Sequence, residues 1–469
     1  MKTSAFFGGA LFVAAIALGC QQFEAVPLQS RPAATRPDPV ALARDAARLE
    51  HPLLKSAAID LSTLNRDGIN SESAAIIAVL NNPALRVERQ RRSIAASQLL
   101  QARLLPNPSL EATYEPVTGG NTLGALNAYS IGPNWEISAL VTHDAKVAAA
   151  EAQSVSVTLD VAWQEWLVAQ AARKAVFDTI ALREQLAATE AVDQQLAEQA
   201  RIIQTAVDAH QKTIVDASVA AAASAKAHSD FLQARHDFHH QQLVLNQALG
   251  YAPEAEIKLA ASSTLPSSLQ LPPESVLERG LEFHRLDLVA LRFGYQSQEQ
   301  ALRAAILGQF PKVVIGIHPA SDNTGVHSVG IGISVDIPIF DRNQAAIANA
   351  KATRQQLYDE FNSRALDSQS ITAQTLADIQ SLTEQIAAAE KTIPAIQRLV
   401  EIYRDALSRH EVDAFSAAAA QNDLLGRRID LLKLKQQLAD AEVALELATG
   451  RSLWQPLSSA SQPSRPENP

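Results

Sequence analysis

This 469-residue sequence has one cysteine, few basic residues relative to acidic ones, and long stretches without glycine or proline. A single cysteine excludes a scaffold held together by disulfides. The formal net charge of −10 excludes a protein that binds nucleic acid through its phosphates. Apolar residues make up 47% of the chain, which excludes a disordered or collagen-like protein. What remains is a large, ordered, alanine-rich chain.

Glycine and proline are absent from residues 134–249, and residues 344–449 contain only Pro394 and Gly426. Helices in compact globular proteins average about 11 to 12 residues, so stretches of this length without a helix-breaking residue are unusual there. The pattern therefore predicts long coiled helices in both halves of the chain.

The N-terminus has the pattern of an export signal. Residues 5–18 are uncharged and mostly apolar, but this run is shorter than the roughly 20 residues of a transmembrane helix. We therefore expect residues 1–19 to be a signal peptide. The following Cys20 resembles the lipidated cysteine of bacterial lipoproteins, although Ala17 stands where leucine is usual. Gln21 rather than aspartate follows, so the resemblance implies lipid anchoring in the outer membrane. An ordinary signal with a chance cysteine is the alternative.

The chain contains two copies of one pattern. The distance from Leu85 to Pro108 equals that from Leu288 to Pro311, and Gly250 precedes Gly450 by 200 positions. Such self-similarity predicts two tandem structural repeats. The predicted division is a signal peptide at 1–19, an acylated N-terminal periplasmic extension at 20–73, a first repeat at 74–253, a linker at 254–274, a second repeat at 275–453 and a disordered tail at 454–469.

Two stretches of each repeat alternate between apolar and small or polar residues, a period typical of β-strands. The clearest is 328–339, where isoleucine and valine alternate mainly with glycine and serine. Its counterpart in the first repeat surrounds Trp135, and further alternating runs precede them at 110–114 and 313–317. A polar loop joins each pair of strands, so we expect two β-hairpins.

One face of these strands is apolar, as in transmembrane β-strands, which alternate lipid-facing and lumen-facing positions. A soluble sandwich with a buried apolar face is the alternative. Four strands cannot close a membrane barrel, and open edges are not tolerated in lipid. We therefore expect a mixed α and β membrane protein whose β-barrel is shared between chains. The lumen-facing barrel candidates are Glu111, Glu115, Glu136, Asp336 and His318.

Three helices are expected in the first repeat, at residues 72–105, 144–207 and 213–249. The middle one would be roughly 95 Å long at about 1.5 Å per residue, and the other two together nearly match it. They could therefore stack end to end beside it. Apolar steps of three and four residues, as from Leu196 to Ala200, provide the seam for such packing.

Three motifs resemble those of a known family. They are Leu-Asn-Asn-Pro-Ala-Leu at 80–85, Leu-Leu-Pro-Asn-Pro-Ser-Leu at 104–110 and Ile-Pro-Ile-Phe-Asp-Arg-Asn-Gln at 337–344. In this order and spacing the chain resembles TolC-like outer membrane efflux proteins, the outer membrane factors, over about residues 74–453. The last motif is similar to the heavy-metal branch of CzcC-like proteins, with Ala345 in place of a glycine that often follows it.

The resemblance implies a homotrimer with a twelve-stranded barrel in outer-membrane lipid and a long, coiled α-helical barrel in the periplasm. It also implies docking to a periplasmic adaptor, or membrane fusion protein, and to an inner-membrane pump of the RND type. The adaptor contacts would lie at the periplasmic tip, where histidines replace both family glycines and Phe415 precedes Ser416 in place of a common Leu-Asp pair. The tip candidates are His210, Asp216, Tyr403, His410 and Asp413.

His236, His239 and His240 are weak candidates for a metal site, because spacings of three and four place side chains on one helix face. A solvated or interhelical polar face explains the same pattern. No nucleophile elbow, phosphate-binding loop or paired-carboxylate setting is visible in the sequence. We therefore expect no catalytic residue and no cofactor.

These observations together predict a passive outer-membrane duct of a tripartite efflux system, which exports small solutes and is not an enzyme. Heavy-metal cations are slightly favoured over drugs as the cargo. The alternatives are a drug or polypeptide duct of the same fold, a periplasmic helical structural or adaptor lipoprotein, and an exported enzyme. The lipoprotein would lack membrane strands and would be extracted by salt or alkali rather than by detergent.

Overall fold

The computed structural model describes residues 23–28, 68–120, 123–261, 263–409 and 411–452. The chain divides into two units, residues 1–35 and 36–469, and residues 23–28 of the first unit form neither helix nor strand. The predicted signal peptide, Cys20 and the predicted tail at 454–469 lie outside the described residues.

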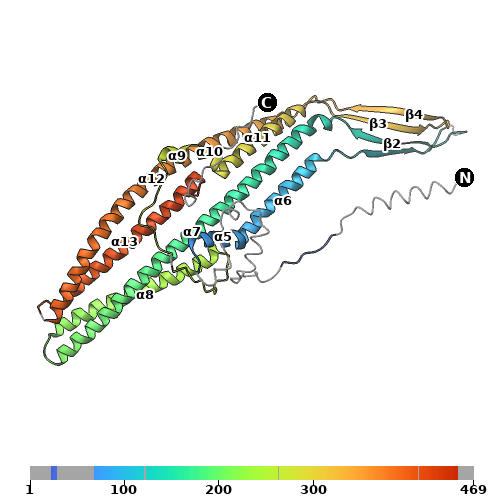
Figure 1. Cartoon of the computed structure of the whole chain (residues 1–469). Helices are drawn as coiled ribbons and strands as arrows, with labels where there is room; N and C mark the ends of the chain where they lie inside the picture. Colours follow the sequence, from blue (N-terminus) through green and yellow to red (C-terminus); the bar gives the residue numbers. More distant parts are fainter. Residues whose placement is uncertain (1–22, 29–67, 121–122, 262, 410, 453–469) are drawn as a thin grey trace. The chain divides into compact units, whose positions relative to one another are not determined.

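The described part of the second unit consists of paired helices and one four-stranded sheet (Figure 1). In chain order the elements are α5 (Ser71–Asn81), α6 (Pro83–Arg103), β1 (Ser109–Glu115), β2 (Ala128–Glu136), α7 (Ala139–Asp208), α8 (Ile214–Ala248), α9 (Glu274–Glu278), α10 (Leu281–His284), α11 (Leu286–Leu307), β3 (Val313–Ser321), β4 (His327–Val335), α12 (Gln344–Ser408) and α13 (Ala414–Thr449). The predicted mixture of long helices and four strands is therefore confirmed.

The long helices form two antiparallel hairpins, α7 with α8 and α12 with α13 (Figure 1). Helix α7 has 70 residues and α12 has 65, which corresponds to roughly 100 Å each at about 1.5 Å per residue. Helix α7 is central, because α5, α6, α8, α11 and α13 all pack against it. The helices predicted at 144–207 and 213–249 are confirmed as α7 and α8.

The single helix expected at residues 72–105 is wrong, since the chain forms α5 and α6 there. Pro83 is the first residue of α6, and a proline disfavours a helical conformation in the residue before it. Asn82 accordingly has a ψ of 119°, and its side chain accepts a hydrogen bond from the Ala84 N–H at 2.9 Å. The Asn82–Pro83 pair therefore ends α5 and caps α6.

The largest hydrophobic core lies where α5, α7, α8 and α13 meet. Ile77 of α5, Ile180 of α7, Leu245 of α8 and Ala439 of α13 are almost completely buried in it. Burial of this kind stabilises each of the leucine and isoleucine side chains by about 1.5–3 kcal/mol relative to exposure. Among the described helices, none is both long and apolar enough to cross a membrane.

A buried ion network also joins α7 to α13. The Arg173 guanidinium donates a 3.0 Å hydrogen bond to Glu442 and contacts Glu446. The Gln170 amide donates to Glu446 at 2.6 Å, and its oxygen accepts from Arg173 at 3.0 Å. Buried charges persist only when they are paired and hydrogen-bonded, so this network holds the two hairpins in one arrangement.

The helical hairpins end at matching glycine joints. Gly250 follows α8 with a φ of 69°, and Gly450 follows α13 with a φ of 66°. A Cβ on Gly250 would lie 2.8 Å from the Asn81 carbonyl oxygen, and one on Gly450 would lie 2.8 Å from that of His284. Both positions therefore require glycine for the left-handed backbone and for the close approach of another chain segment.

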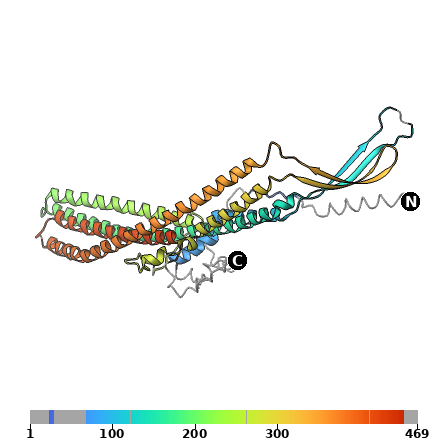
Figure 2. The same cartoon turned by 90° about the horizontal axis from the view of Figure 1, so that it is seen from above.

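The sheet has the order β1-β2-β3-β4, with every neighbouring pair antiparallel (Figure 2). Strands β1 and β2 form one β-hairpin, and β3 and β4 form the other. The two β-hairpins are joined by pairing between β2 and β3, where for example Trp135 lies opposite Ile315. The predicted strands are confirmed: β1 and β3 extend beyond the runs expected at 110–114 and 313–317, and only β4 ends earlier than its run at 328–339. Strand β4 ends at Val335 although the apolar alternation continues to Ile339, because its partner β3 begins at Val313.

Candidate functional site

The sheet carries an apolar face that is exposed to the surroundings of the chain. The register brings Ile317 opposite Ile331 and Ile315 opposite Ile333, and Ala112 lies opposite Ile131. Ile331 is 75% exposed and Ile317 is 50% exposed. An exposed apolar patch that follows every strand marks a surface for lipid or for another protein.

The opposite face of the sheet is polar or small. By register, Glu111 and Glu115 of β1, Glu136 of β2 and His318 of β3 all lie on it. Asp336 follows β4 with the parity of this face, and its N–H donates to the Lys312 carbonyl at 3.0 Å. The five barrel candidates therefore share one side of the sheet.

Sequence reasoning missed the role of one polar residue, Asn134, and of the glycines beside it. The Asn134 side chain donates a 2.6 Å hydrogen bond to Glu111 across β1 and β2. A Cβ on Gly316 would overlap the Asn134 oxygen and lie 2.5 Å from His318 Nε2. The glycines on this face were visible in the alternation, but only the strand register shows which side chains lie over them.

The Phe340–Gln344 motif forms the turn from β4 into α12. Asn343 has a φ of 59°, and its N–H donates to the Asp341 side chain at 2.8 Å. Its side-chain amide donates to the Ala305 carbonyl of α11 at 2.8 Å, and Gln344 donates to Phe340 at 3.1 Å. The described hydrogen bonds of Gln344 stay within the turn, whereas the side chain of Asn343 also fastens the turn to α11.

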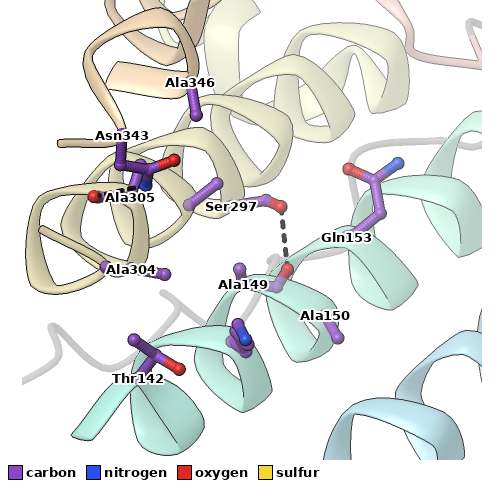
Figure 3. Close-up of a pocket in the computed structure, with 12 residues that line it drawn as sticks. Thr142, Ala149, Ala150, Gln153, Ser297, Ala304, Ala305, Asn343 and Ala346 are labelled. Carbon is purple, nitrogen blue, oxygen red and sulfur yellow. Dashed lines mark hydrogen bonds between the residues drawn. The ribbon is translucent and has the colours of Figure 1, made fainter. Parts of the chain in front are cut away.

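A cavity of about 530 Å³ lies beside this turn, between α7, α11 and α12 (Figure 3). Asn343 lies above Ala305, and Ser297 donates to the Ala149 carbonyl at 2.8 Å. Half of the lining residues are alanines, and α7 contributes the polar side chains of Thr142, Lys146 and Gln153. The cavity therefore has few polar groups that would orient a ligand.

The two helical hairpins turn at neighbouring tips. Helix α8 begins with a capping box, in which Thr213 and Asp216 each accept a hydrogen bond from the other's N–H. Asp413 caps α13 by accepting from the Ser416 N–H at 2.8 Å. These N–H donors lower the pKa of Asp216 and of Asp413, while the nearby charge of Asp413 slightly opposes the lowering at Asp216.

The other tip candidates are placed differently. His210 lies in the turn with a φ of 59°, a conformation that favours the glycine it replaces. Tyr403 belongs to α12 rather than to the turn. His410 lies outside the described residues. Leu407 packs against the cluster around Ile203 of α7, so the tips touch through apolar side chains as well.

The histidines of α8 do not gather into a metal site. The rings of His236 and His240 are 6.5 Å apart between centroids, while His239 lines a separate cavity of about 720 Å³ with Arg183 and Lys258. Within the described ranges, no group of three or more His, Cys, Asp or Glu side chains could hold a metal ion. The pattern is that of a polar helix face.

This fold is that of outer-membrane efflux channels. The chain superposes on a crystal structure of CusC with a TM-score of 0.68 and 19% identity, covering 90% of this chain and 99% of CusC. It superposes on the outer membrane protein VceC of Vibrio cholerae with a TM-score of 0.68 and 17% identity, covering 82% and 96% of the two chains.

Sequence comparison agrees with the fold. Residues 281–451 match the family model described as outer membrane efflux protein, which confirms the resemblance predicted from the motifs. The chain is 26% identical over 219 residues to the cation efflux system protein CusC of Escherichia coli strain K12, covering 45% of this chain and 47% of CusC. The matched region thus spans about half the length of this curated relative.

Proposed function

We propose that the chain is the outer-membrane channel subunit of a tripartite efflux system and forms a passive homotrimeric duct. The sheet carries this proposal, because it has an exposed apolar face, a polar face, and β1 and β4 as its outer strands. Outer strands without partners would leave backbone groups unsatisfied in lipid. Three chains of four strands would close a twelve-stranded barrel, a size within the range of membrane barrels.

In this assembly the apolar face meets lipid and the polar face lines the lumen. Glu111, Glu115, Glu136, His318 and Asp336 would then face the exported solute. The duct needs no catalysis of its own, since the inner-membrane pump supplies the energy. The tips around Asp216 and Asp413 are the exposed ends of the helical hairpins, and they would meet the periplasmic adaptor.

Small cations are the cargo that best fits this chain. Cation efflux appears in the name of CusC, which the chain resembles in sequence over nearly half its length. The four strands contain three glutamates and neither lysine nor arginine, so the wall of the duct would attract cations and repel anions. Drugs and polypeptides remain possible outcomes of the test.

The duct itself is tested by fractionation and mass. Outer membranes that carry the chain are washed with alkaline carbonate and then extracted with detergent. A channel subunit resists the wash and leaves the membrane in detergent as a particle with the mass of three chains. Release by alkali would instead support a periplasmic lipoprotein.

The cargo is tested in a strain that lacks the gene, complemented with the wild-type chain or with an empty vector. We expect the deletion to lower the inhibitory concentrations of divalent cations and to raise the cell-associated metal. A panel of hydrophobic drugs serves as the comparison. Sensitivity to drugs alone would support the duct and contradict cation export.

The proposal includes a lipid anchor at Cys20. Labelling with a palmitate analogue should mark the wild-type chain and leave the Cys20→Ser variant unmarked, with both chains exported. Equal labelling of the two would show that lipid is attached elsewhere.

A further inference from the structure

Three side chains of different strands meet near the middle of the polar face. Glu111 of β1 lies directly opposite Gly132 of β2. A Cβ on Gly132 would overlap the Ile317 carbonyl oxygen and lie 3.0 Å from the Cα of His318, so the backbone of β3 passes close beside this glycine at His318. Asn134 lies two residues further along β2, on the same face. Glu111 and His318 therefore lie on the two strands that flank Gly132.

Glycines make room for these side chains to lie along the sheet. The site of a Cβ on Gly316 is already taken by the Asn134 oxygen and lies 2.5 Å from His318 Nε2. A Cβ on Gly332 would approach the same imidazole at 3.1–3.2 Å. An alanine at either position would press on the imidazole. The space left by the missing side chains of Gly316 and Gly332 therefore brings the Asn134 oxygen and the His318 nitrogen together over Gly316.

The hydrogen bond between Asn134 and Glu111 fixes which atoms are left to bind a ligand. The Asn134 amide donates to Glu111 Oε2 at 2.6 Å, so its oxygen is oriented away from that carboxylate. Glu111 keeps its other oxygen as an acceptor. The three side chains thus offer a carboxylate oxygen, an amide oxygen and an imidazole nitrogen. Divalent transition metals such as Zn²⁺ accept this mixture of donors.

The charge of the strands favours the same ligand. The four strands contain Glu111, Glu115 and Glu136 but no lysine or arginine, so no cation of the strands competes for the Glu111 carboxylate. A carboxylate without a fixed counter-charge attracts mobile cations. The imidazole adds the preference for a transition metal over an alkali cation.

We propose that Glu111, Asn134 and His318 form a transit site for a divalent transition-metal cation, present once per chain on the wall of the duct. The inference rests on the proposed function, since it requires that the polar face line the lumen. Each chain supplies one carboxylate and one imidazole, fewer strong ligands than a storage site needs. Weak binding suits a conduit, because an ion that binds too tightly cannot leave.

The test measures the block of ion current by Zn²⁺ in planar lipid bilayers at about 0.1 M KCl, where charges are only moderately screened. Wild-type channels should show a concentration-dependent fall in K⁺ conductance. His318→Ala and Glu111→Gln should each raise the half-blocking concentration about tenfold, as expected for the loss of one contact to a charged ligand. Glu115→Gln removes the same charge from the same face, and His327→Ala removes an imidazole from the opposite face, so neither should change the block.

Two further controls test whether each variant forms the channel and whether the acidic residues of the tips contribute to the block. His318→Gln keeps a side chain that can hydrogen-bond, and K⁺ conductance in the absence of Zn²⁺ shows that a variant forms the channel. All comparisons are repeated in channels that also carry Asp216→Asn and Asp413→Asn, so that the exposed carboxylates of the tips do not contribute to the block.

The outcomes separate the two proposals. Conducting channels that Zn²⁺ blocks equally in all variants would overturn the transit site and leave the duct intact. An equal loss of block in Glu111→Gln and Glu115→Gln, with no effect of His318→Ala, would show general charge attraction and also overturn the site. No conductance from the wild-type chain would overturn the duct, and the transit site with it.

Discussion

Where the helices of this chain pack together, large aliphatic side chains are buried between them, whereas in the sheet the isoleucines and valines of β4 point out of the protein. Ile180 of α7 is 1% exposed, and Leu438 of α13 is fully buried. Val329 and Ile331 of β4 are 73% and 75% exposed. The same residue types thus serve a protein core in one region and an outer surface in the other. The difference fits the proposed duct, in which water surrounds the helices and lipid covers the apolar face of the strands.

Charged side chains follow the same division. The helical part buries Arg173 with Glu442 and Glu446, where hydrogen bonds compensate the loss of water. In the sheet, the glutamates lie on the face opposite the isoleucines. A test of the comparison therefore changes one charge in each region.

The largest effect is expected in the helical part. Arg173→Met removes the counter-charge of two buried carboxylates and should lower the free energy of unfolding by about 3–5 kcal/mol. The measurement is thermal and denaturant unfolding of the detergent-solubilised protein, followed by circular dichroism. Arg201→Met is the control, because Arg201 pairs with Glu198 on the surface at 2.6 Å, and an exposed ion pair contributes little to stability. Equal effects of the two variants would contradict the structural role of the network.

The next effect tests the strands. Ile331→Lys places a charge on the apolar face and should destabilise the membrane-embedded assembly by about 2–4 kcal/mol, if that position lies near the middle of the bilayer. Ser328→Lys adds the same charge three residues away on the polar face and should have a much smaller effect. Denaturant unfolding in lipid vesicles measures both. If Ser328→Lys were the more harmful variant, the polar face would be the one that meets lipid.

The sequence predicted this division well, because strand alternation is a local property. The exposed run from Val329 to Val335 was expected from the period of two, and the ends of α7 and α8 lie within a few residues of their predicted positions. The sequence analysis missed the break between α5 and α6 at Asn82–Pro83. A proline is tolerated in the first turn of a helix, so the helical pattern continues in α6 directly after the break and hides it.

The parts that could not be predicted depend on residues far apart in the chain. Arg173 and Glu442 are separated by 269 positions, and no local pattern links them. The contact of Asn134 with Glu111 depends on the exact register of β1 and β2. Strand alternation predicted that Glu111 and His318 share one face, but only the register placed His318 beside the Asn134 oxygen over Gly316.

A smaller effect tests the glycine joints at the ends of the hairpins. Gly250→Ala should destabilise the protein by about 1–3 kcal/mol, because its φ is 69° and a Cβ would lie 2.8 Å from the Asn81 oxygen. Gly426→Ala is the opposite case, since nothing lies within 4 Å of its Cβ position in α13. It should raise the stability by about 0.5–1 kcal/mol. Thermal unfolding of both variants should therefore shift in opposite directions, and a shift of the same sign would contradict the description of the joint.

The smallest effect concerns the tips, where charged groups are exposed to water. Folding lowers the pKa of Asp216 and Asp413 because N–H groups of Thr213 and Ser416 donate to the carboxylates. A lowered pKa means that the stabilisation is fully present above the ordinary carboxyl pKa of about 4 and is lost as the pH falls through the folded value. Hydrogen exchange of peptides that cover the starts of α8 and α13 measures this as a fall in protection factors below about pH 4.

The double variant Asp216→Asn and Asp413→Asn is the control for this effect, because asparagine also accepts hydrogen bonds at helix starts but does not titrate. Its protection factors at the tips should be lower than those of the wild type near neutral pH and should change little as the pH falls. A peptide from α5 should keep its protection in both proteins, since the contacts of this helix in the core are mainly apolar. If the double variant lost protection over the same pH range as the wild type, carboxylate capping would not be what holds the tips together, and the apolar contact of Leu407 with the Ile203 cluster would have to account for it.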